Sequence, residues 1–255
     1  STYNSIRLWT DGKTPLWAYF DIHGLFLFLI FSFLVWDTGR WLRSVTVKTL
    51  RGTWAFLIAA LFIIIGVIAG ALALASASYQ VTLVALPMII WVGILFFRQG
   101  QLRIMQFLLA LVGLALALTL GVEYIVLDGD IGRQNTVFKF YIQVWLMFSI
   151  VGGVALSILW AASERWRWYL RTPWTVILVG LIAVASLFPV MAARGKASFR
   201  MDTVANSEGI KPDYPLTLDG MAFMTLARRY EGDSDVSAMY ADRTAFTLAD
   251  DYAMI

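Results

Sequence analysis

The residues best suited to chemistry lie in one stretch, GVEYIVLDGDIGRQNTVFKFY, which covers residues 121–141. It contains carboxylates that could accept a proton and cations that could hold a phosphate: Glu123, Asp128, Asp130, Arg133 and Lys139. Long apolar runs stand on both sides of it. We therefore interpret residues 123–136 as a polar hairpin between two membrane helices, and we expect any chemistry of this chain to occur there.

The functional interpretation of the hairpin is an anion site. Arg133, Lys139 and the N–H groups at the start of the following helix could converge on a phosphate, with Asn135 as a further polar contact. Glu123 and Asp128 are the catalytic candidates, because a carboxylate can orient a sugar or take the proton of a nucleophile. Asp128 and Asp130 could bind Mg²⁺ or Mn²⁺ through oxygen, but two carboxylates are too few to predict a metal site.

The same charges also have a structural interpretation. Glu123 lies near the carboxyl end of one helix and Lys139 in the first turn of the next, and each has the sign that the local helix dipole disfavours. A Glu123–Lys139 or an Asp128–Arg133 ion pair could fix the hairpin, since partly buried charges in membrane proteins usually pair. A loop that is simply solvated is a third interpretation.

A secondary polar site consists of Asp21 and His23 near the start of the first apolar span, together with Asp130. Asp21 and His23 are two residues apart and do not share a helix face. Their shallow depth favours interfacial or packing roles. We keep them as candidates because they lie on the same side of the membrane as the hairpin.

Composition places the chain among polytopic membrane proteins. Of its 255 residues, 60% are hydrophobic and 15% are charged, whereas soluble domains carry about 25% charged residues. The sequence has no cysteine and one histidine, which excludes disulfides, cysteine nucleophiles and multi-histidine metal sites within it. No basic stripe with interleaved aromatic residues suggests nucleic-acid binding.

We expect an all-α, polytopic helical membrane protein with about six transmembrane helices and an exoplasmic carboxyl-terminal segment. The transmembrane domain covers residues 1–192, and the exoplasmic tail covers 193–255. In the tail, Asp219 could cap a short helix over residues 220–230. Both ends of the sequence look cut, so we expect an internal fragment of a longer polypeptide. The predicted spans are 16–36, 54–75, 80–97, 104–122, 137–162 and 173–192.

Charge counting orients these spans. The loops after spans one, three and five contain nine Lys/Arg and two acidic residues, whereas the opposite side contains four Lys/Arg before the tail. The positive-inside rule therefore places the three basic loops in the cytoplasm. The hairpin and the tail then lie outside a cell membrane.

Three stretches carry a family resemblance: EYIVLD with RQNTVFKFYIQVW (123–128 and 133–145), TPLWAYFDIHGLFLF (14–28) and YPLTLDGMAFM (214–224). They resemble the Chlor-Arch-YYY domain proteins, large uncharacterised membrane proteins of archaea and Chloroflexi. The resemblance implies a place near the GT-C membrane glycosyltransferases, which take sugars from polyprenyl-phosphate donors at the outer face. Their catalytic carboxylate usually lies in an earlier outer loop, so this chain could hold the donor-phosphate side.

Three functions follow as hypotheses. The first is a GT-C-like transferase, or part of one, with a polyprenyl phosphate and a lipid-linked sugar as its partners. The second is a non-catalytic structural or accessory subunit that binds protein partners in a membrane complex. The third, a transporter, ranks last because spans two, three, four and six carry almost no ionisable residues deep in the bilayer.

Overall fold

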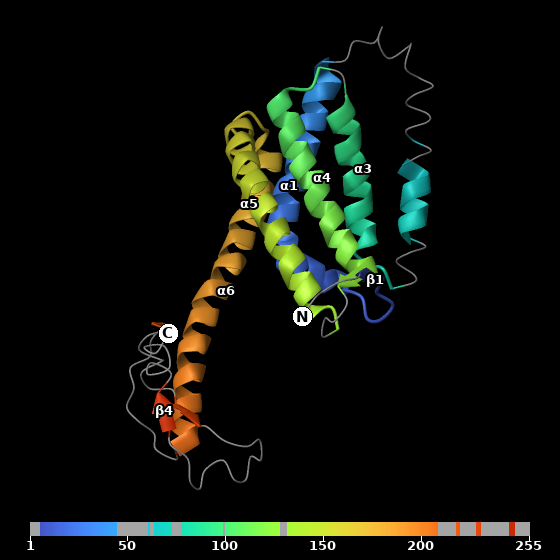
Figure 1. Ribbon diagram of the computed structural model, residues 1–255. Helices are drawn as coiled ribbons and strands as arrows, with labels where there is room; N and C mark the ends of the chain where they lie inside the picture. Colours follow the sequence, from blue (N-terminus) through green and yellow to red (C-terminus); the bar gives the residue numbers. More distant parts are fainter. Residues whose placement is uncertain are drawn as a thin grey trace. The chain divides into compact units, whose positions relative to one another are not determined.

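Long α-helices form most of the structure (Figure 1). The computed structural model describes residues 6–44, 61, 64–72, 78–98, 100–127, 132–208, 218–219, 228–230 and 245–247. The chain is thus a helical membrane protein, as its composition predicts. The labelled helices are α1 (Leu16–Ser44), α3 (Thr82–Phe97), α4 (Arg103–Tyr124), α5 (Gln134–Ser163) and α6 (Trp168–Glu208).

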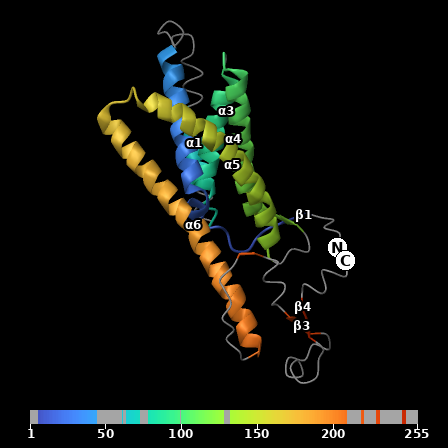
Figure 2. The ribbon, with the colours of Figure 1, turned by 90° about the vertical axis from the view of Figure 1, so that its left-hand side faces the viewer.

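Helices α1, α3, α4 and α5 lie side by side around one apolar core (Figures 1 and 2). On α1 the buried positions recur every three or four residues, as expected for one face of a helix. The sequence along this face is Tyr19, His23, Leu27, Ile30, Leu34 and Asp37. The face is apolar in its middle and polar toward both ends, which restricts chemistry to the ends of the bundle.

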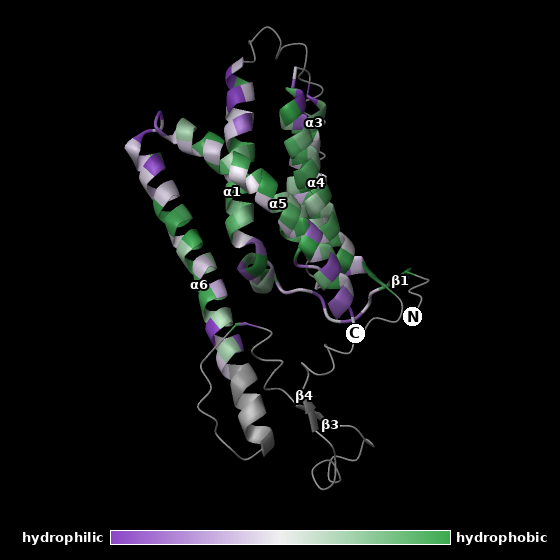
Figure 3. Ribbon diagram, turned by 60° about the vertical axis from the view of Figure 1, so that its left-hand side comes forward, coloured by the Kyte–Doolittle hydropathy of each residue, from purple (hydrophilic) through white to green (hydrophobic). Residues whose placement is uncertain are grey.

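Small residues allow these helices to approach closely, as is common within membranes. A Cβ atom added at Gly152 of α5 would lie 3.4 Å from Phe26 Cδ1 of α1, and one added at Gly113 of α4 would lie 3.4 Å from Val92 Cγ1 of α3. The ribbons of α3 and α4 are mostly hydrophobic (Figure 3), and α4 exposes Ile104, Phe107 and Leu114. Such surfaces suit contact with lipid.

Four of the predicted spans correspond to helices that are long and apolar enough to cross a membrane: Leu16–Ser44, Arg103–Tyr124, Gln134–Ser163 and Trp168–Ser198. The predicted span 80–97 is the shorter apolar helix α3, of 16 residues. Most of the predicted span 54–75 lies outside the described residues; its described residues, 61 and 64–72, are helical.

Helix α1 is eight residues longer than the predicted span 16–36. The physical reason is Asp37, which is fully buried rather than part of a loop. Its carboxylate accepts hydrogen bonds from Arg98 Nη2 at 2.9 Å and from Gln101 Nε2 at 3.1 Å. Arg40 Nη2, one helical turn on, lies 3.4 Å from the same carboxylate. The basic loops therefore begin beyond an ion-pair cluster that joins α1 to the α3–α4 connection.

The predicted sixth span, 173–192, lies within the longer helix α6. Helix α6 continues through residues 193–208. By its contacts the chain divides into two units, 1–181 and 182–255, so α6 contributes to both. The first unit contains every candidate residue discussed below.

Two short antiparallel ladders accompany the helices. Strand β1 (Ile6–Leu8) pairs with β2 (Ile125–Leu127), and β3 (Arg228–Tyr230) pairs with β4 (Ala245–Thr247). The predicted helix over 220–230 is wrong for residues 228–230, because a distant strand accepts and supplies their backbone hydrogen bonds. Residues 220–227 lie outside the described part of the chain.

Candidate functional site at the hairpin end of the bundle

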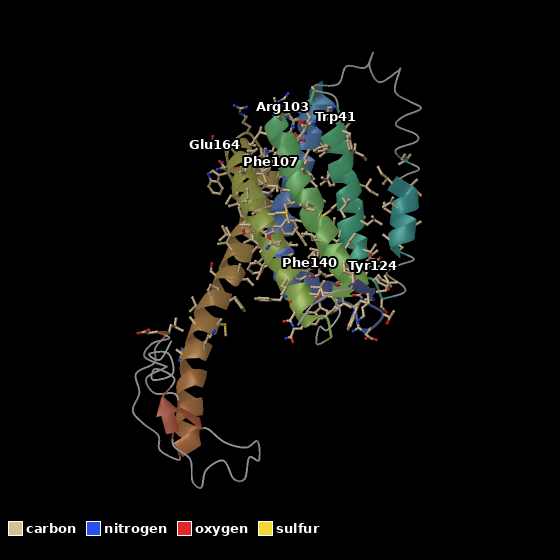
Figure 4. All side chains as sticks on the ribbon, viewed as in Figure 1. Trp41, Arg103, Phe107, Tyr124, Phe140 and Glu164 are labelled. Atoms are coloured by element: carbon tan, nitrogen blue, oxygen red, sulfur yellow. The ribbon has the colours of Figure 1, made fainter. Side chains whose placement is uncertain are left out.

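The hairpin end is the end of the bundle where α4 stops and α5 starts. Figure 4 shows Tyr124 and Phe140 there, and Trp41, Arg103 and Glu164 at the opposite end. Glu123 belongs to the buried face of α4, one turn after Thr119. Only 1% of Glu123 is exposed. Its helical position therefore directs a carboxylate into the bundle interior, where an unpaired charge would cost several kcal/mol.

Glu123 is held by Thr14 and Arg133, and we call these three residues the Glu123 cluster. Glu123 Oε1 accepts hydrogen bonds from Thr14 Oγ1 at 2.6 Å and from Arg133 Nη1 at 2.8 Å. Glu123 Oε2 accepts one from the Thr14 backbone N–H at 3.0 Å. Arg133 Nη2 donates to Thr14 Oγ1 at 2.8 Å, which closes the triangle. The segment before α1, the end of α4 and the residue before α5 thus meet at one carboxylate.

Two cations also occupy the carboxyl end of α4. Arg133 Nη1 donates to the Val122 carbonyl at 2.8 Å, and Lys13 Nζ donates to the Glu123 carbonyl at 2.8 Å. Carbonyls in the last turn of a helix lack partners within the helix, and cations there oppose the negative end of its dipole. The unfavourable sign of Glu123 at this position is therefore compensated by Arg133 and Lys13.

The segment before α1 is fixed onto the same helix end. Besides the β1–β2 ladder, the Trp9 N–H donates to the Tyr124 carbonyl at 2.8 Å. The rings of Tyr79 and Tyr124 stack with centroids 4.9 Å apart, and Lys13 Nζ lies 4.5 Å from the Tyr79 ring centroid. Lys13 is thereby held in one place, with an aromatic face beneath its ammonium group.

An open pocket of about 660 Å³ lies beside Lys13. Residues 10–13 with Pro15 form one wall, and residues 78–80 form the other. Acidic Asp11 and basic Lys13 are both among the lining residues. Among the residues that the structure describes, Lys13 forms no ion pair, and its ammonium group donates to the carbonyls of Trp9 and Glu123. The pocket therefore offers both a proton acceptor and a positive charge.

Three further polar side chains lie deeper in the bundle. Tyr19 Oη shares a hydrogen bond of 3.1 Å with Thr119 Oγ1. The His23 ring lies 5.1 Å from that of Tyr19 and 4.8 Å from that of Tyr141, between ring centroids. His23 is fully buried and Tyr141 is 9% exposed. These side chains extend the polar region inward from the Glu123 cluster.

The structure brings together only some of the predicted site residues. Glu123 forms an ion pair with Arg133. The sequence instead suggested Lys139 as the partner of Glu123, or Asp128 as the partner of Arg133. Lys139 and Asn135 are exposed near the start of α5. Asp128 and Asp130 lie outside the described residues, so their catalytic and metal roles stay predictions.

Asp21 and His23 point to different surroundings, as their spacing predicts. Asp21 is exposed and His23 is buried. Within the described parts of the chain, no three His, Cys, Asp or Glu side chains come together as a metal site.

Sequence reasoning missed Lys13, Thr14 and Asp11, which precede the first helix, and Tyr19 and Tyr141. For the two tyrosines a signal exists, because each lies on a buried helical face. Leu27 follows Tyr19 by eight residues, and Val144 and Phe148 follow Tyr141 by three and seven. For residues 11–14 only the long-range pairing of β1 with β2 brings them to the site.

Together these features define a helical membrane protein with a charged, partly buried site at one end of its bundle. The chain belongs to the uncharacterized membrane protein family DUF2298, whose model matches residues 1–148. The match includes both the Glu123 cluster and the pocket. Comparisons with curated proteins and with solved structures return no match.

The Glu123 cluster makes a testable contribution to stability. Arg133→Ala leaves a buried carboxylate without its cation, so we expect it to lower the free energy of unfolding by about 3–5 kcal/mol. Adding Glu123→Gln removes the unpaired charge and is expected to restore part of that loss. Unfolding of the purified protein in detergent measures both effects.

The matched control is Arg167→Ala. Arg167 is exposed and donates to the Tyr169 hydroxyl at 3.2 Å, so we expect a change within about 0.5 kcal/mol. Equal losses for Arg133→Ala and Arg167→Ala would contradict a buried ion pair at Glu123.

Proposed function

We propose that this chain is part of a transferase that moves a sugar from a polyprenyl-phosphate donor at the outer membrane face. Its resemblance to the Chlor-Arch-YYY proteins and, through them, to GT-C glycosyltransferases suggests this reaction class. The observation that carries the proposal is the pocket lined by Asp11 and Lys13 at the hairpin end.

Lys13 is the cation for the donor phosphate. Its ammonium group is fixed by two carbonyls, at 2.6 Å from Trp9 O and 2.8 Å from Glu123 O, so its charge is not cancelled by these contacts. The guanidinium group of Arg133 is paired with the Glu123 carboxylate. Arg133 is therefore a positioning residue, because it holds Glu123, whose carbonyl binds Lys13. Near the start of α5, exposed Lys139 adds a positive charge and exposed Asn135 adds a neutral hydrogen-bond donor for the lipid phosphate.

A carboxylate is needed as the general base. Asp11 lines the pocket, whereas both oxygens of Glu123 already accept hydrogen bonds within the cluster. In the proposed step the acceptor hydroxyl oxygen bonds to the anomeric carbon, and the bond from that carbon to the phosphate oxygen breaks. The hydroxyl proton passes to the carboxylate, and the polyprenyl phosphate leaves as an anion beside Lys13.

A second candidate function is a non-catalytic subunit of a membrane complex. The specific observation in its favour is the mutual neutralisation of Glu123 and Arg133, which fits a cluster that only fixes the fold. Large aromatic residues are also exposed on α1 and α5, among them Trp17, Phe138 and Trp145. A protein partner within the membrane could cover them.

The transferase proposal requires the hairpin end to face outward, with the basic loops in the cytoplasm and the tail outside. The cysteine-free sequence allows a direct test. Gly12→Cys has room, since nothing lies within 4 Å of an added Cβ, and Arg103→Cys is exposed at the opposite end (Figure 4). We expect a membrane-impermeant maleimide to label Gly12→Cys in intact cells and Arg103→Cys after permeabilisation. Labelling with the reverse preference would contradict the outward placement.

Binding of a lipid phosphate tests the proposed role of Lys13. We expect native mass spectrometry of the gently solubilised protein to detect bound polyprenyl phosphate, and Lys13→Ala to weaken this binding at least about tenfold, since a hydrogen bond to a charged group contributes roughly 1.5–3 kcal/mol. Lys13→Arg keeps the charge and should retain most of the binding, and Arg167→Ala serves as the control at the opposite end.

Unchanged lipid binding in Lys13→Ala, Lys139→Ala and Arg133→Ala would contradict the transferase proposal. A stoichiometric protein partner, found without such a lipid, would support the structural subunit instead.

A further inference from the structure

His23 lies on the buried face of α1, and its ring nitrogens lack the hydrogen-bond partners that an imidazole can use. The residue is fully buried, and neither Nδ1 nor Nε2 has a hydrogen-bond partner among the described residues. A neutral imidazole carries one donor and one acceptor. Buried polar groups almost always have partners, so both nitrogens require an explanation.

Tyr141 shares this condition and faces the same place. Its hydroxyl is buried, and it lies close to the Thr14 hydroxyl without a hydrogen bond of good geometry. The His23 and Tyr141 rings meet edge to face with centroids 4.8 Å apart. The unpaired atoms are the two ring nitrogens of His23 and the hydroxyl oxygen of Tyr141. Because the two rings are in contact, we treat these atoms as one site.

The charges around this site decide what it can bind. The nearby carboxylate is Glu123 and the nearby cation is Arg133, and they neutralise each other at 2.8 Å. A cation or anion bound at His23 and Tyr141 would therefore find Glu123 and Arg133 already paired with each other. An apolar guest would leave the three atoms unpaired. The remaining class is a small neutral molecule that both donates and accepts hydrogen bonds.

We propose that His23 and Tyr141 bind one buried water molecule. The Tyr19 hydroxyl, bonded to Thr119 at 3.1 Å, has a remaining lone pair and supplies a third partner. Two to four polar partners are typical of a buried water. This site does not depend on the proposed transferase activity.

Polar side chains connect the water site to the hairpin end of the bundle. Toward the hairpin end, Tyr141 leads to Thr14 and the Glu123 cluster. Toward the other end, the buried face of α1 continues with Leu27, Ile30 and Leu34, which offer no polar side-chain group. The polar route from His23 therefore ends inside the bundle in one direction and reaches the hairpin end in the other.

Nuclear magnetic resonance can test the site directly, because His23 is the single histidine of the sequence. Ring-¹⁵N-labelled histidine in the full chain, embedded in lipid nanodiscs, gives one imidazole signal. We expect a neutral ring with a slowly exchanging N–H and a cross-peak from that N–H to bound water. Tyr141→Phe removes one partner of the water and should reduce this cross-peak at least severalfold.

Tyr169→Phe is the control, since Tyr169 lies just after the α5–α6 turn and is 48% exposed. It should leave the cross-peak unchanged. A wild-type ring N–H without a water cross-peak, or one that exchanges rapidly with bulk water, would overturn the proposal. An equal cross-peak in Tyr141→Phe would also overturn it. If Tyr141→Phe does not fold, the wild-type spectrum alone decides.

Discussion

A carboxylate inside an apolar helix bundle must be paired, and the structure at the hairpin end depends on how Glu123 meets this requirement. Its cation comes from the first residues before α5, and its remaining hydrogen bonds come from the segment before α1. The Glu123 carboxylate thus holds both the α4–α5 connection and the segment before α1 in place. Lipid tails are as apolar as the helix surfaces, so polar contacts of this kind are well suited to selecting one arrangement of helices.

The same requirement applies at the opposite end, where Asp37 pairs with Arg98 and joins α1 to the α3–α4 connection. Between the two clusters the core is apolar, apart from the tyrosines, threonine and histidine near the hairpin end. Apolar packing fills the middle of the bundle, whereas ion pairs determine which chain segments meet at its ends. Among the described residues, a pocket lies beside the cluster at the hairpin end.

The helices could be predicted from the sequence because apolar runs of 18 or more residues have few alternatives to a membrane span. The ends of the helices could not be predicted in the same way. Asp37, for example, has the composition of a loop residue, and only its ion pair with Arg98 explains why it is buried within α1. At the site, helical spacing assigns Glu123 and Tyr141 to buried faces and Lys139 to an exposed one. The partner of Glu123 was missed for a different reason. Arg133 is near in sequence, but its selection over Lys139 depends on Thr14, which lies 109 residues away from Glu123.

The most direct test asks whether Arg133 holds the amino-terminal segment against the α4–α5 junction. In the cysteine-free chain, Ile6→Cys with Leu127→Cys joins paired positions of the β1–β2 ladder, whereas Ile6→Cys with Ile125→Cys is out of register. Paired residues in an antiparallel ladder lie within reach of a disulfide. We expect rapid oxidation of the first pair, slow oxidation of the second, and a marked loss of the first when Arg133→Ala is added. Equal rates for the two pairs, or a rate unaffected by Arg133→Ala, would contradict the account.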